Sequence, residues 1–143
     1  MIKYNLLFSC LITVLSCKTP PVSPHSYKHE IISFGSGGGF SGAYSEYFLL
    51  DNGKILSLSE DKKQYLEVKQ IKSNLSSQIF NNIKTFGLDT LSYVHPQNMY
   101  YFLKFKNGTD SNFVSWSGKP VGKISAAASI YKLLNSQLKS IDK

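Results

Sequence analysis

Hydrophobic and polar residues alternate along much of the chain with the period of two that is typical of β-strands. In residues 99–106, Tyr101, Leu103 and Phe105 all fall on one side of this alternation. Asn-Gly pairs at 52–53 and 107–108 predict tight hairpin turns, because both residue types tolerate positive φ. We therefore predict mostly antiparallel strands over residues 28–34, 40–50, 55–58, 65–71, 99–106 and 112–116.

Two segments show the helical period instead. The first begins near Ser73 and Asn74, both good N-caps, and repeats apolar residues every four positions until Gly87, which suits the position after a helix. The second covers 124–141, with apolar residues at intervals of three and four and lysines on the other side. The predicted order is β-β-β-(β)-α-β-β-α, a single α+β domain in which two helices accompany a mainly antiparallel sheet.

The N-terminus has the pattern of a targeting segment. Lys3 precedes the mostly apolar stretch 6–15, which is too short for a bilayer span of about 20 residues but fits a secretory signal. The stretch ends in Val14-Leu15-Ser16-Cys17, which resembles the lipobox of bacterial lipoproteins. This resemblance implies that residues 1–16 are a cleaved signal peptide and that Cys17 carries acyl chains such as palmitate. The alternative is an ordinary signal peptide with an incidental cysteine.

The two cysteines support the same organisation. Cys10 would leave with the signal peptide and Cys17 would be acylated, so no thiol would remain for a disulfide, for catalysis or for a zinc site. Prolines in residues 17–27 predict an extended tether, followed by the domain over 28–143. Lys18 resembles the residue that outer-membrane lipoproteins tolerate after the cysteine. We expect a cell-envelope protein held by membrane lipid through Cys17, in the outer membrane, with the exposed face undetermined.

The charge of the chain does not indicate a nucleic-acid partner. The 143 residues have a formal net charge of +7, and all 16 basic residues are lysines. The lysines are scattered, with 62–63 as the only adjacent pair. Arginine is the preferred residue for reading phosphate and guanine, so a binder without any arginine is improbable. We predict a solvated basic surface and no nucleic-acid binding.

No motif in the sequence predicts catalysis, a metal or a cofactor. The three histidines do not form H-E-x-x-H, and no G-x-S-x-G accompanies the serines. Residues 37–42 satisfy G-x-G-x-x-G, but a strand is predicted after them, where a dinucleotide site needs a helix. We therefore predict a protein that is not an enzyme. A small hydrolase assembled from scattered polar residues stays open as an alternative, because sequence does not exclude carboxylates paired in space.

The glycine-rich segment itself is the candidate contact site: Gly37, Gly38, Gly39, Phe40, Ser41 and Gly42. Its glycines could serve only the backbone, in a wide turn or bulge with positive φ and Phe40 turned inward. They could instead let the backbone approach a partner, with Phe40 as the anchor. An exposed Phe40 favours the second interpretation and a buried one the first.

The segment Gly38-Gly39-Phe40-Ser41-Gly42 resembles the Gly-Gly-Phe-x-Gly segment of emfourin-type inhibitors of thermolysin-like metalloproteases, and the order of elements over 31–138 is similar. The resemblance implies an α+β fold and a protein-binding role, with protease inhibition as its sharpest version. We predict a membrane-anchored lipoprotein with a non-enzymatic domain that binds an extracytoplasmic protein such as a protease. The alternative is a structural or assembly lipoprotein of the envelope without an inhibitory role.

Overall fold

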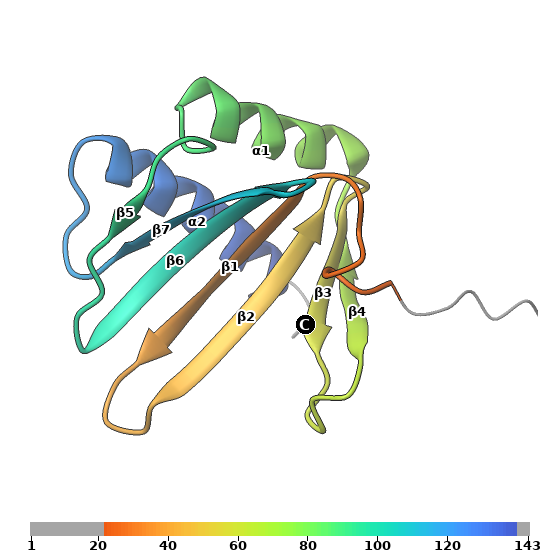
Figure 1. The fold of residues 1–143 in the computed structure, drawn as a ribbon, viewed down its shortest axis with the longest axis horizontal. Coiled ribbons are helices and arrows are strands. Elements are labelled where there is room, and N and C mark those ends of the chain that lie inside the picture. The colour runs from red at the N-terminus through yellow and green to blue at the C-terminus, as the bar shows by residue number, and fades with distance from the viewer. Residues whose placement is uncertain (1–21, 140–143) are drawn as a thin grey trace, which may run out of the picture.

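The strand β1 (Ile31–Gly38) lies at the centre of a seven-stranded sheet (Figure 1). The computed structural model describes residues 22–139, so the predicted signal peptide and Cys17 lie outside the described residues. All neighbouring strands are antiparallel except the pair β5–β7. The strands follow the order β4 (Tyr65–Gln70), β3 (Lys54–Leu58), β2 (Ala43–Leu50), β1, β6 (Met99–Asn107), β7 (Asp110–Trp116) and β5 (Tyr93–Val94).

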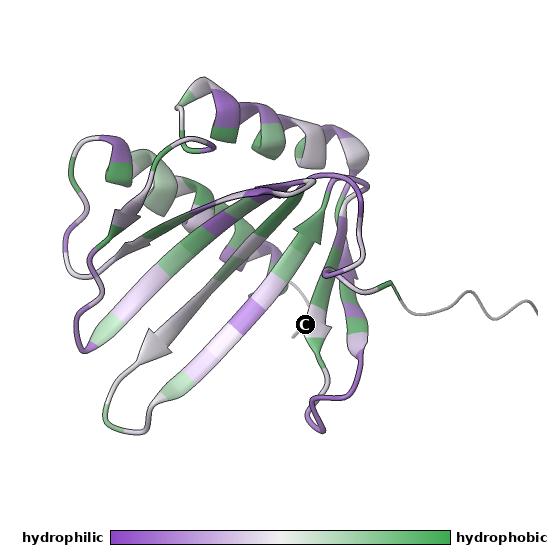
Figure 2. Ribbon diagram, in the orientation of Figure 1, coloured by the Kyte–Doolittle hydropathy of each residue, from purple (hydrophilic) through white to green (hydrophobic). Residues whose placement is uncertain are grey.

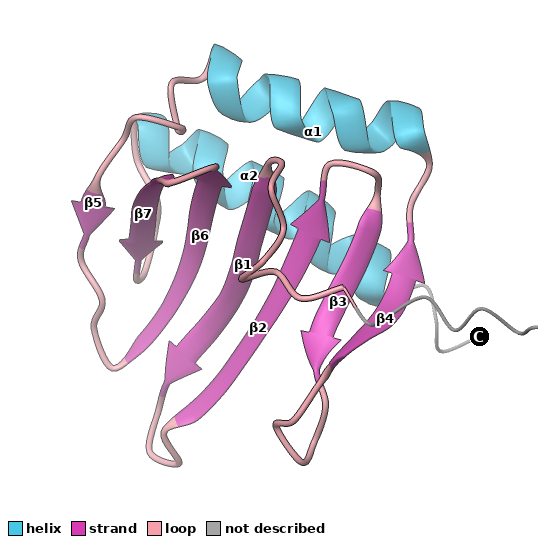
Figure 3. Cartoon of the chain, turned by 45° about the vertical axis from the view of Figure 1, so that its right-hand side comes forward, coloured by secondary structure: helices cyan, strands magenta, loops and turns pink. Residues whose placement is uncertain are grey.

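Both helices, α1 (Ser73–Thr85) and α2 (Lys123–Lys139), cover the same face of the sheet (Figures 1 and 3). The main core lies between them and the sheet, and burial of its apolar surface is the chief stabilising contribution to the fold. Leu103 and Phe105 of β6 point into this core, as their alternation predicts. The predicted α+β class with two helices on a mainly antiparallel sheet is confirmed.

The other face of the sheet is largely uncovered in the described part of the chain. It carries a small cluster of buried apolar residues near the Leu50 end of β2 and the buried Phe102 of β6. Along β2 the residues change from hydrophobic at this end to hydrophilic in the middle of the strand (Figure 2). The N-terminal residues 22–30 lie against this face. Pro24 is buried, and the Tyr27 hydroxyl donates a hydrogen bond to the Asp51 carboxylate. The described part of the predicted tether, residues 22–27, is therefore not a free spacer but contacts the domain.

Three local expectations differ from the structure. The glycine run does not end the first strand, because Gly35, Gly37 and Gly38 belong to β1 and pair with β2 on one side and β6 on the other. The short strand β5 is not among the predicted strands. The N-cap of helix α1 is Lys72, which makes no side-chain capping bond, so the predicted capping by Ser73 or Asn74 is wrong.

The end of α1 agrees with the prediction: Gly87 follows the C-cap residue Phe86 and has a φ of 63°. Neither helix in residues 22–139 is long and apolar enough to cross a membrane.

Candidate functional site

The predicted contact segment forms the tip of the β1–β2 hairpin. Gly38 pairs with Ala43 as the last pair of the two strands, and residues 39–42 form the turn. The Gly42 amide donates a hydrogen bond to the Gly39 carbonyl at 3.0 Å, which closes the turn. Gly38, Gly39 and Gly42 have φ values of 94°, 80° and 62°, a region that side chains other than glycine rarely adopt. The positive φ expected for this segment is therefore present.

Phe40 is fully exposed at this tip, with a relative accessibility of 109%. Ser41 and Gly42 beside it are also exposed. Tyr44 of β2 and Met99 of β6 add exposed apolar surface close to the turn, at 60% and 50%. Tyr44 and Met99 lie on opposite faces of the sheet, so Phe40 stands between exposed apolar residues of both faces. An aromatic side chain that nothing covers is available for contact with a partner.

Gly37 has a different role, because it is buried inside β1. A Cβ atom there would lie only 2.5 Å from the Tyr100 hydroxyl oxygen and 2.6 Å from Cζ of the same ring. At Gly35 a Cβ atom would lie 2.9 Å from Cζ of Phe102 and 1.9 Å from the Ser45 carbonyl oxygen. The two glycines therefore leave space for aromatic rings of β6 to lie over β1, an arrangement known to stabilise glycines in strands.

These rings continue into a row of aromatic side chains on the open face of the sheet. The Tyr44 ring stacks on Phe102 with centroids 5.6 Å apart and an angle of 9° between the planes. Phe102 also contacts Tyr100 and Phe113. The alternation in residues 99–106 puts Tyr100 and Phe102 on the side opposite Tyr101, but the pattern within this segment does not connect them with the glycines. The feature that could have indicated this packing is a glycine directly opposite an aromatic residue of the neighbouring strand.

The exposed end of this row carries one polar contact. The Tyr44 hydroxyl donates a hydrogen bond to Glu46 at 3.0 Å. Burial, followed by the negative charge of Glu46, raises the pKa of Tyr44 well above its usual range. Tyr44 is therefore a neutral hydrogen-bond donor at any physiological pH, and it orients the Glu46 carboxylate.

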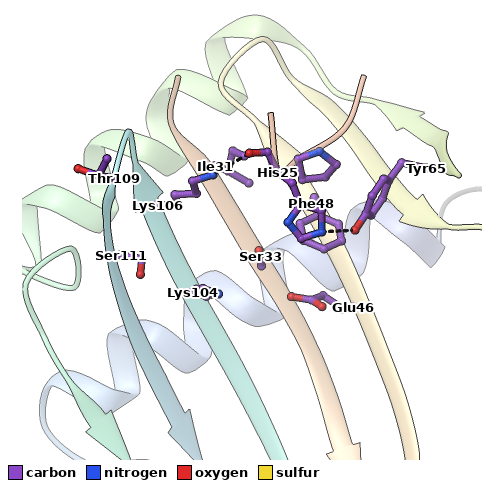
Figure 4. A pocket seen from close by; sticks show the side chains of 11 residues that line it. His25, Ile31, Ser33, Glu46, Phe48, Tyr65, Lys104, Lys106, Thr109 and Ser111 are labelled. Atoms are coloured by element: carbon purple, nitrogen blue, oxygen red, sulfur yellow. Dashed lines mark hydrogen bonds between the residues drawn. The ribbon is translucent and has the colours of Figure 1, made fainter. Parts of the chain in front are cut away.

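A pocket of about 340 Å³ lies further along the open face, under the N-terminal residues (Figure 4). His25 closes it from above, where its Nε2 atom lies 2.9 Å from the Tyr65 hydroxyl and its carbonyl accepts a hydrogen bond from Lys106. Its other polar lining residues include Ser33, Glu46, Lys104, Thr109 and Ser111. The pocket brings together one histidine and one carboxylate, whereas the hydrolase alternative expects clustered carboxylates beside a histidine.

The histidines are dispersed over the described part of the chain. His25, His29 and His95 each contact a different tyrosine ring. Within residues 22–139, no three His, Cys, Asp or Glu side chains are grouped so as to hold a metal ion.

The sequence matches no model of a protein family and no curated protein. The resemblance to emfourin-type inhibitors stays a prediction from the sequence of residues 38–42 and the predicted order of elements.

Proposed function

We propose that this protein is a lipid-anchored lipoprotein of the cell envelope whose domain binds another protein through the tip of the β1–β2 hairpin, without catalysing a reaction. The observation that supports this role best is the full exposure of Phe40 between glycines. A residue needed only for the fold would be packed against the sheet or a helix. An aromatic side chain held out on a turn is a typical anchor for a pocket in a partner.

The anchor follows from the lipobox-like residues that end in Cys17. Val22, the first residue of the described chain, comes five positions later and begins the segment that packs on the sheet. Five residues span at most about 18 Å, so the domain would sit close to the membrane surface. Replacing Cys17 by serine should abolish acyl labelling and membrane retention of the protein. Persistent acylation of that variant would contradict the lipoprotein assignment.

A protease is the partner that the resemblance to emfourin-type inhibitors suggests. Thermolysin is the natural first probe, and its inhibition by the detergent-solubilised full-length protein would support the sharper version of the proposal. A failure to inhibit thermolysin would contradict inhibition of this protease class but not the binding of another protein, which is tested separately.

The binding role is tested with Phe40→Ala, and Leu66→Ala serves as control because Leu66 is an exposed apolar residue of β4. Immobilised full-length protein would be used to retain partners from envelope extract. We expect Phe40→Ala to lower the amount retained at least about tenfold, because such anchors contribute about 2 kcal/mol or more. Its stability should change by less than about 0.5 kcal/mol, since the side chain is exposed. Equal retention by wild type and Phe40→Ala would contradict the proposal.

A further inference from the structure

The pocket under the N-terminal residues has opposite charges on its two sides. Lys104 and Lys106 of β6 line one side, and Glu46 of β2 lines the other (Figure 4). Both lysines point to the open face, because Leu103 and Phe105 alternate with them and enter the main core. Strand β1 separates β2 from β6, and no ion pair joins either lysine to Glu46 in the described part of the chain. Both charges are therefore available to a ligand.

The floor of the pocket contains a hydroxyl group without a hydrogen-bond partner among the described residues. Ser33 of β1 lies between Lys104 and Phe48 of the two neighbouring strands, and only 6% of the residue is exposed. Its hydroxyl makes no hydrogen bond to another residue in the range 22–139. Thr109 and Ser111 add two more hydroxyls on the side of the lysines (Figure 4). Because buried polar groups are normally hydrogen-bonded, Ser33 points to a partner inside the pocket.

The opposite side of the pocket suits a cation. The Glu46 carboxylate accepts one hydrogen bond from Tyr44 and has capacity for more. The rings of Phe48 and Tyr65 also line this side, and they meet edge to face with centroids 5.3 Å apart. Burial, followed by the negative charge of Glu46, raises the pKa of Tyr65, so the field of the carboxylate reaches this ring. A carboxylate beside aromatic rings attracts an ammonium group through both its charge and the ring faces.

We propose that this pocket binds a small zwitterion in which a phosphate ester is joined to an ammonium group. The phosphate lies at Lys104 and Lys106, and the ammonium group lies at Glu46. Two lysines and three hydroxyls complement a phosphate monoester, which carries nearly two negative charges and three acceptor oxygens, better than a singly charged carboxylate. Pro24 and His25 also line the pocket, and its volume of about 340 Å³ suits a small ligand. The site is separate from the hairpin tip, so this inference does not depend on the proposed function.

The first probe is O-phosphoethanolamine, titrated into the full-length protein in an uncharged detergent and followed by NMR. We expect saturable shifts of the amide signals of Ser33, Glu46 and Lys104. Inorganic phosphate and ethanolamine each carry one half of the probe. Each half should bind at least about tenfold more weakly than the probe, because joining two groups makes the second contact intramolecular. Absence of saturable binding, or inorganic phosphate binding as tightly as the probe, would overturn the inference.

A second probe distinguishes a free ligand from a lipid headgroup, since both sources offer a phosphate ester joined to an ammonium group. Glycerophosphoethanolamine has the phosphodiester of such a headgroup without the acyl chains. We expect the monoester to bind more tightly, because its additional negative charge meets the second lysine. Tighter binding of the diester would support the same site with a lipid headgroup as its ligand. Failure of both probes to bind would overturn the inference.

Variants of the charged residues test the two sides of the pocket separately. Lys104→Gln/Lys106→Gln should weaken both O-phosphoethanolamine and inorganic phosphate at least about tenfold. Lys119→Gln is the control, because Lys119 is exposed outside the pocket, and it should change neither by more than about twofold. Glu46→Gln should weaken O-phosphoethanolamine at least about threefold and leave inorganic phosphate equally or more tightly bound. Unchanged binding by the double lysine variant, or equal weakening of both compounds by Glu46→Gln, would overturn the inference.

Discussion

The two ends of the β1–β2 hairpin are built differently. At one end Ile31 pairs with Leu50, and both side chains are buried in the small cluster against which Tyr27 and Tyr65 pack. At the other end Gly38 pairs with Ala43, which is exposed, and the turn presents Phe40 to solvent. The same pair of strands therefore serves stability at one end and exposes apolar side chains at the other. Substitutions at the two ends should accordingly change different quantities.

The largest effect is expected from a charge at the buried end of β2. Leu49→Asp places a carboxylate at a position with 0% exposure in the main core, and it should cost about 4 kcal/mol or more of folding free energy. Ala43→Asp lies on the same side of the same strand but is exposed, and it should cost less than about 0.5 kcal/mol. Chemical denaturation of both variants measures the difference. Similar losses of folding free energy in the two variants would contradict the difference in burial between the two ends of β2.

A smaller effect is expected where the rings lie over β1. Gly35→Ala should cost about 3 kcal/mol, because its Cβ would meet the fixed main-chain carbonyl of Ser45 at 1.9 Å. Gly37→Ala should cost about 1–2 kcal/mol, because its Cβ meets the side chain of Tyr100, which can shift. Thermal melts of the two variants provide the test. A larger loss of stability in Gly37→Ala than in Gly35→Ala would contradict this packing.

The N-terminal segment over the buried end gives a pH-dependent prediction. Burial and the hydrogen bond to Asp51 raise the pKa of Tyr27 above its usual range. The unfolded chain therefore loses this proton first, so the stabilisation is complete below about pH 10 and declines as the pH rises further. Tyr27→Phe should lower stability by about 1 kcal/mol at neutral pH. Denaturation curves from pH 7 to about pH 12 should show the gap to wild type narrowing; a gap that widens would contradict the assignment.

Much of the fold follows from short-range patterns in the sequence. The helical period around Ile79 and the alternation in β6 placed their elements correctly, because local periodicity and one buried face point to the same structure. The glycine run was expected to leave the sheet, since glycine disfavours strands when considered alone. It remains in β1 because rings from β6 occupy the space that side chains would fill, and that pairing is non-local.

The candidate site was predicted in part. Phe40 and the glycines with positive φ are recognisable from the residue types that turns require. The pocket under the N-terminal residues was not predictable, because it depends on how residues 22–30 lie against the sheet. The packing of Pro24 on the sheet was also missed, because proline-rich composition alone predicts an extended spacer.

The central claim is that the Phe40 end of the hairpin, and not the opposite end of the sheet, meets a protein partner. Its most direct test is photo-crosslinking in intact cells, with a photoreactive amino acid in place of Phe40 or, as control, in place of Thr109. Thr109 is also exposed, and it lies in the β6–β7 turn at the other end of the sheet. We predict a discrete crosslinked protein from position 40 that is absent from position 109. The same products from both positions, or none from position 40, would contradict the account.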